Sequence, residues 1–213
     1  MMKKLTLTLL AACLMLASNV CFAEVNLWNL NRVDADFSEE LGFEAEQEFR
    51  FSDGVNDFVY ESSDFGLRYL PSEMLTLGFN FRQVFADTGD GFTPESRPHV
   101  NIGLSFWLFD DALEISDRVR TEFRFVGDDD MSLRFRNLLS LGLEVLDNVK
   151  LVVTDELFVT TEGLDENRLG VGARAQVNTT VDLGLAYHLQ TMGLGDDEVT
   201  NGHAVLANLY LSF

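Results

Sequence analysis

Two neighbouring segments of the chain alternate between polar and apolar side chains with a period of two residues. In residues 113–125 and 132–145, nearly every second side chain is charged or small, and those between are mostly apolar. Successive side chains of a β-strand point to opposite faces, so each segment is predicted to be a strand with one ionic and one apolar face. The charged side chains of the ionic faces include Arg118, Arg120, Glu122, Arg124, Arg134 and Arg136.

Similar segments recur along the chain. Each has about the 9–11 residues that a tilted barrel strand needs to cross the hydrocarbon core of a membrane. No run of about 20 apolar residues follows residue 23, so no transmembrane helix is predicted there. The ten predicted strands are 42–52, 58–70, 75–85, 99–109, 113–125, 132–145, 149–160, 167–177, 181–191 and 204–213.

The first 23 residues have the pattern of a secretory signal peptide. Lys3 and Lys4 precede an apolar stretch at 5–17, and Cys21-Phe22-Ala23 resembles a cleavage site. A lipoprotein signal at 10–13 is the alternative. Cleavage after Ala23 removes both cysteines, so we expect neither a disulfide nor thiol chemistry in the mature chain.

Two all-β architectures fit alternating strands: a transmembrane barrel and a secreted sandwich. Three features favour an antiparallel up-and-down transmembrane β-barrel. The polar faces hold arginine rather than lysine, since Lys150 is the one lysine after residue 23. Those faces also carry many glycines, which leave room inside a narrow tube. The chain ends on an alternating strand that closes with an aromatic residue, Phe213.

The connections between strands predict an orientation and a location. Tight turns alternate with longer, mostly acidic loops, as in outer-membrane barrels, where the short turns face the periplasm. We therefore expect the bacterial outer membrane, with lipid and lipopolysaccharide as surroundings and Phe213 as the signal for the barrel assembly machinery. The net charge of −20 argues against nucleic acid as a partner.

The number of strands and three polar residues are less clear from the sequence. Bacterial barrels have an even number of strands, which favours ten from Gly42 to Phe213, with twelve as the alternative. Residues 24–41 are then a lead-in, a short strand or a lumen plug. The alternation slips near Ser62-Ser63, which suggests a bulge. Three polar residues fall on the apolar face: Asp117, Asn137 and Asp155. An interface between protomers or a lateral opening of the barrel could explain them, but we expect local bulges that turn them inward.

The predicted lumen is almost neutral, with ten arginines facing nine acids. A balanced ionic interior in a small barrel indicates a network of ion pairs rather than a wide pore. The predicted function is therefore a narrow channel or a structural barrel. The inward arginines are Arg50, Arg68, Arg82, Arg118, Arg120, Arg124, Arg134, Arg136, Arg168 and Arg174, and the inward acids Glu44, Glu46, Glu48, Asp64, Glu114, Glu122, Glu144, Glu156 and Asp182.

Several motifs resemble an uncharacterised family of small bacterial outer-membrane barrels. The resemblance implies the fold and the location, but no established activity. It covers nearly the whole chain after the signal peptide. The motifs are Arg118-x-Arg120-x-Glu122-x-Arg124, Arg134-x-Arg136-Asn137, Asp155-Glu156-Leu157-Phe158 and Asn167-Arg168, together with Trp28 and the strand that holds Arg50.

A cluster on four successive predicted strands is the candidate binding site. Clustered guanidinium groups could hold a small anionic solute through a carboxylate or phosphate. The alternative is a salt-bridge ladder that only closes the lumen. The cluster consists of Arg118, Arg120, Glu122, Arg124, Arg134, Arg136, Glu156 and Arg168.

Two other classes of function remain as alternatives. A membrane-embedded hydrolase would need a nucleophile beside a base, but His188 is a lone inward histidine, and His99 and His203 are predicted to flank loops. A surface-binding protein would use the acidic loops at 87–90, 128–130 and 196–198, although their spacing does not make a calcium loop. No cofactor, metal site or catalytic residue is predicted.

Overall fold

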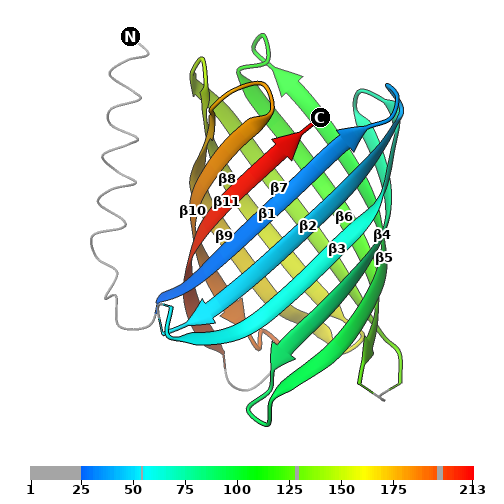
Figure 1. Ribbon diagram of the computed structural model, residues 1–213, viewed down its shortest axis with the longest axis vertical. Helices are drawn as coiled ribbons and strands as arrows, with labels where there is room; N and C mark the ends of the chain where they lie inside the picture. Colours follow the sequence, from blue (N-terminus) through cyan, green and yellow to red (C-terminus); the bar gives the residue numbers. More distant parts are fainter. Residues whose placement is uncertain (1–24, 54, 128–129, 196–198) are drawn as a thin grey trace.

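The computed structural model describes residues 25–53, 55–127, 130–195 and 199–213. These residues form eleven strands that close into one barrel (Figure 1). None of them belongs to a helix long and apolar enough to cross a membrane. The strands are β1 (Val25–Asp36), β2 (Leu41–Ser52), β3 (Asp57–Ser72), β4 (Leu75–Asp87), β5 (Phe92–Leu108), β6 (Leu113–Val126), β7 (Ser132–Leu146), β8 (Val149–Thr160), β9 (Gly163–Gln176), β10 (Val181–Met192) and β11 (Thr200–Ser212).

The barrel is antiparallel everywhere except at its closure. Sequential strands pair antiparallel from β1 to β11, and β1 then pairs with β11 in parallel. Figure 1 shows these two strands side by side, both tilted in the same direction. The prediction of an all-β barrel is confirmed, but ten strands, twelve strands and a purely antiparallel barrel were wrong. The parallel pair is the physical reason, because it allows an odd number of strands to close.

Strand β1 comes from the segment that precedes the ten predicted strands. Its ladder to β11 runs in register from Val25 opposite His203 to Asp34 opposite Ser212. At the end of the chain, the Phe213 amide donates to the Asp34 carbonyl at 2.9 Å, and the Asp36 amide donates to the Phe213 carbonyl at 2.9 Å. The last residue of the chain is therefore hydrogen-bonded into the closure. The start of β1 and Phe213 lie at opposite ends of the barrel (Figure 1).

The two ends of the barrel differ in their connections. We call the end that holds Phe213 the turn end, and the opposite end the loop end. Turn-end connections are residues 37–40, 73–74, 109–112, 147–148 and 177–180, and loop-end connections are 53–56, 88–91, 127–131, 161–162 and 193–199.

Polar side chains point into the barrel, and apolar side chains point outward. On the inside, Glu122 is fully buried and Arg82 is 5% exposed. On the outside, Phe79 is 65% exposed and Leu185 is 62% exposed. The predicted inward direction of the arginines is thus confirmed. The described residues contain one small buried apolar cluster, around Trp28, Ala204 and Leu206.

Two inward glycines make room for large neighbours. A Cβ atom on Gly66 would collide with the side chain of Asn80, which crosses above it. A Cβ atom on Gly170 would collide with Thr154 and lie 2.7 Å from Nε2 of His188. Both glycines therefore allow polar side chains of adjacent strands to fill the lumen.

Strand β5 begins earlier than the sequence predicts. The prediction was a loop at 87–96 and a strand from residue 99, whereas β5 begins at Phe92 and includes Pro94 and Pro98. Proline lacks the amide that donates in a ladder. In the structure both prolines pair with β4, and the ladder to β6 skips Arg97 and Pro98. The strand accommodates Pro98 at this interruption. His99 is consequently buried inside the barrel rather than beside a loop.

The bulge predicted near Ser62-Ser63 lies at Val59 in the same strand, where the β2–β3 ladder shifts register. The bulges predicted at Asp117, Asn137 and Asp155 were wrong. The ladders through Ser62-Ser63 and through Asp117, Asn137 and Asp155 continue without a register shift. Asp117, Asn137 and Asp155 therefore stay on the outer face. They form hydrogen bonds there: Asn137 donates to Asp117 at 2.6 Å, and Asn167 donates to Asp155. Side-chain pairing on the surface replaces the inward turn that we expected.

Candidate functional site

A layer of ion pairs fills most of the loop-end half of the barrel. We call it the ion-pair layer. It contains eight arginines and six carboxylates from β2 to β9, and most of them are buried. Their cross-strand register places them together in the interior. The layer consists of Glu48, Arg50, Asp64, Arg82, Glu95, Arg97, Arg120, Glu122, Arg124, Arg134, Arg136, Glu156, Glu166 and Arg168.

Glu122 is a central acceptor of this layer. Its carboxylate accepts from Arg134 at 2.6 Å and from Arg136 at 2.8 Å, while Nη1 of Arg120 lies 3.7 Å away. All three arginines are less than 10% exposed. A buried carboxylate surrounded by guanidinium groups compensates charges that would otherwise be very unfavourable in the interior.

Other arginines bridge further strands. Arg82 on β4 donates to Asp64 on β3 at 2.8 Å and to Glu46 on β2 at 2.7 Å. Arg97 makes two bonds of 2.7 Å to Glu95 within β5. The Arg82 contacts connect β2, β3 and β4 through the lumen, whereas the Arg97 contacts lie within one strand.

Aromatic rings complete the layer. Phe158, only 1% exposed, lies 4.4 Å from the guanidinium carbon of Arg168 and 4.7 Å from that of Arg136. Trp28 on β1 lies 4.1 Å from that of Arg50. Cation–π contacts of this kind stabilise guanidinium groups that have little water around them. Side chains therefore fill most of the loop-end half, which retains a cavity of about 210 Å³ between Arg50, Arg97 and Arg134.

The predicted site residues all point into the lumen, on strands β6 to β9. Six of them form one network connected through Arg136, and two form ion pairs with other acids. Glu122 joins Arg134 and Arg136, and Glu156 accepts from Arg136 and Arg118. Arg124 binds Glu95 instead, and Arg168 binds Glu166. Glu95, Arg97 and Glu166 were not among the predicted inward residues, because all three precede the predicted starts of their strands at residues 99 and 167.

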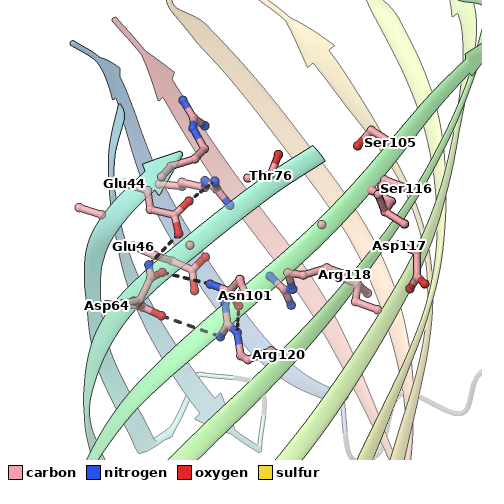
Figure 2. Close-up of a pocket in the computed structure, with 18 of the residues that line it drawn as sticks. Glu44, Glu46, Asp64, Thr76, Asn101, Ser105, Ser116, Asp117, Arg118 and Arg120 are labelled. Atoms are coloured by element: carbon pink, nitrogen blue, oxygen red, sulfur yellow. Dashed lines mark hydrogen bonds and ion pairs between the residues drawn. The ribbon is translucent and has the colours of Figure 1, made fainter. Parts of the chain in front are cut away.

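The turn-end half is open and lined by smaller side chains. Two adjoining cavities of about 410 and 460 Å³ occupy it, and Arg118 and Arg120 line both. We call the two cavities together the vestibule. Figure 2 shows Arg118 and Arg120 from β6 opposite Glu44, Glu46 and Asp64 across one cavity. Small inward residues of the vestibule are Thr76, Gly78, Gly103, Ser105, Ser116, Ser140, Gly142, Gly172 and Gly184.

The histidines show no catalytic arrangement in the described residues. Nδ1 of His99 contacts the Arg97 carbonyl at 3.1 Å, His203 pairs with the Tyr187 hydroxyl, and Nδ1 of His188 has no described hydrogen-bond partner. No group of three metal-ligating side chains occurs in the described residues either. Part of the predicted acidic loops, residues 128–129 and 196–198, lies outside the described residues.

A comparison with protein families places this chain. A family model described as "Protein of unknown function (DUF2490)" matches residues 25–200, from the first residue of β1 to the start of β11. The chain belongs to the DUF2490 family. No curated protein matches the chain. The family match covers ten complete strands of this DUF2490 barrel and every residue of its ion-pair layer.

Proposed function

We propose that this DUF2490 protein is an integral outer-membrane barrel whose lumen is closed by the ion-pair layer. Its role is that of a closed barrel with an open vestibule rather than of a general diffusion pore. The observation that carries the proposal is the inverted distribution of side chains, with charges enclosed and apolar groups exposed. Soluble monomers rarely expose contiguous apolar patches larger than a few hundred Å².

The outward apolar surface supports insertion into lipid. Exposed side chains such as Leu67 on β3, Ile102 on β5, Leu141 on β7 and Leu183 on β10 occur on strands around the barrel. Every strand has 12 or more residues, enough to cross a hydrocarbon core of about 30 Å when tilted. The signal peptide predicted at 1–23 fits export to this location.

Aromatic residues near both ends give further support. At the loop end, the ring of Phe58 lies 5.4 Å from Phe51 and 5.5 Å from Phe92. At the turn end, Phe109 is 78% exposed and Phe213 is 70% exposed. Outer-membrane barrels carry such aromatic girdles at the two membrane interfaces. We place the turn end in the periplasm, with Phe213 there for the barrel assembly machinery.

The enclosed layer argues for a closed lumen. Arg82, Arg120, Glu122 and Phe158 are each at most 5% exposed, and the cavity that remains within the layer is small, about 210 Å³, which favours a lumen without a wide aqueous path. Small barrels have interiors that side chains can fill. We therefore expect no continuous ion current through the unmodified barrel.

Two measurements test this proposal. The refolded protein should migrate differently on a gel before and after boiling, as compact barrels do, and should need detergent or lipid to remain in solution. In planar bilayers it should show no steady conductance. A protein that stays monomeric in buffer without detergent would overturn the membrane assignment. Large, stable open channels would overturn the closed lumen while leaving the membrane assignment intact.

A further inference from the structure

The floor of the vestibule contains two arginines, each with a buried guanidinium nitrogen that lacks a described hydrogen-bond acceptor. Arg120 is 5% exposed and donates through Nε to Asn101 at 2.7 Å. Its Nη1 is buried and has no described hydrogen-bond partner. The nearest carboxylate oxygens, on Glu122 and Asp64, are 3.7 and 3.9 Å away. Both oxygens already accept shorter bonds, from Arg136 and Arg82 respectively.

Arg118, two residues earlier on the same face of β6, is in a similar position. Its Nη2 lies 3.2 Å from Oε1 of Glu156, an oxygen that also accepts from Arg136 at 2.7 and 3.1 Å. Its Nε is buried without a described partner. Buried donors without partners are rare in folded proteins, and they indicate a missing acceptor.

The charge of the adjoining layer points to the same kind of acceptor. The ion-pair layer has eight guanidinium groups and six carboxylates, an excess of two positive charges. Adding its neighbours Arg118 and Glu46 adds one charge of each sign, so the excess stays at two. An excess of positive charge in an enclosed interior favours a bound anion. A carboxylate suits two neighbouring guanidinium groups because it accepts their hydrogen bonds in a planar, bidentate geometry.

The opposite wall of the vestibule carries an apolar row between polar side chains such as His188 and Arg174. The cross-strand ladders place Val152, Gly172, Ala186, Leu206 and Trp28 in one inward row from β8 to β1. All five line the larger cavity. A sixth lining residue, Leu138, pairs directly with Arg118, so apolar surface begins beside the two guanidinium groups. The site therefore combines a cationic floor with an apolar row on the opposite wall.

We propose that the vestibule binds a single-chain anionic amphiphile, with its carboxylate on Arg118 and Arg120 and its aliphatic tail along the apolar row. The cavity volume of about 460 Å³ falls in the range of small-molecule sites, about 300–1,000 Å³. This inference goes beyond the proposed function, since it assigns a ligand class to the open half of the barrel. The ligand proposal depends only on the lumen. A negative result in the binding experiment therefore leaves the proposed function intact, and a negative result in the conductance experiment leaves the ligand proposal intact.

Trp28 provides a reporter inside the site. The chain has two tryptophans, so a Trp107→Phe variant leaves Trp28 as the sole one. We expect octanoate, added to this folded variant in detergent, to change Trp28 fluorescence saturably. Acetate supplies the charge without the tail, and octanol supplies the tail without the charge. Both should bind at least about tenfold more weakly, since hydrogen bonds to charged groups and buried methylenes each contribute strongly.

Matched variants on β6 complete the test. Arg118→Gln with Arg120→Gln should weaken octanoate binding about tenfold or more, because the charge-assisted hydrogen bonds are lost. Thr121→Ala, on the outer face of β6 and outside the vestibule, is the control and should leave binding unchanged. If the gel assay shows that the double variant does not fold, Arg120→Lys replaces it. This variant keeps the positive charge but loses the bidentate guanidinium geometry, so it should weaken octanoate binding by itself. The proposal would be overturned if acetate bound as tightly as octanoate, or if octanoate gave no saturable change in fluorescence. It would also be overturned if the folded arginine variants bound octanoate as tightly as the unmodified lumen does.

Discussion

Single residues of the lumen are fixed by their partners across the barrel. Glu122 illustrates this, because its carboxylate accepts from two arginines of β7 while a third, Arg120 on its own strand, lies at 3.7 Å. The period-two pattern of β6 predicted that Glu122 points inward. It could not predict which arginines it meets, because pairing depends on the register between strands. Arg124 and Arg168 show the limit, since they bind acids outside the predicted cluster.

Removing the charge of Glu122 should strongly destabilise the barrel. Glu122→Gln leaves buried guanidinium groups without compensation, and breaking a buried ion pair in this way costs about 3–5 kcal/mol. The free energy of unfolding in urea, followed in lipid or detergent, measures the loss. Glu144→Gln is the matched control, because Glu144 pairs with Lys150 and both side chains are partly exposed. That control should cost about 1 kcal/mol or less. Equal losses for the two variants would contradict the enclosed network.

At the scale of elements, the strands with clear alternation were predictable and the closing strand was not. Inward residues of β1 include both Leu30 and Arg32, and outward residues include both Asn29 and Val33. Polar and apolar groups on each face cancel the period-two signal, so the sequence left residues 24–41 undecided. Tertiary pairing with β11 and β2 makes this segment a strand. The expectation of an even number of strands then favoured ten or twelve, whereas the barrel has eleven among the described residues.

The parallel pairing of β1 with β11 can be tested by cross-linking. Asn29 and Ala207 are direct neighbours in the ladder and lie on the outer face. Both native cysteines lie within residues 1–23, so a chain expressed from residue 24 onward with Asn29→Cys and Ala207→Cys has no competing thiol. Neighbouring strands bring Cα atoms within disulfide range, so we expect oxidation to cross-link this pair.

A mismatched pair is the control for that experiment. Asn29→Cys with Leu211→Cys places the second thiol four residues further along β11, beyond the reach of a disulfide. It should stay reduced under the same conditions. Cross-linking of the mismatched pair in preference to the matched pair would contradict the parallel register.

The whole molecule is asymmetric along its axis. The loop-end half is mostly filled by the ion-pair layer, and the turn-end half contains the vestibule, although charged residues occur on strands throughout. The sequence indicated a paired, filled interior from its balance of arginines and acids. It could not place the cavity, because some inward glycines leave open space whereas others are covered by neighbouring side chains, as Gly66 is by Asn80 and Gly170 by His188. Cavity shape depends on how side chains of different strands meet.

The central claim is that lipid covers the outer face of the barrel. Quenching of tryptophan fluorescence by lipids with brominated acyl chains measures this contact directly. Phe79→Trp, in a chain where Trp28 and Trp107 are replaced by Phe, puts a reporter at an outward position that is 65% exposed. Trp28 alone, in the Trp107→Phe variant, is the inward control at 4% exposure. The account predicts strong quenching at position 79 and little at position 28. Equal, weak quenching at both positions in the folded protein would contradict it.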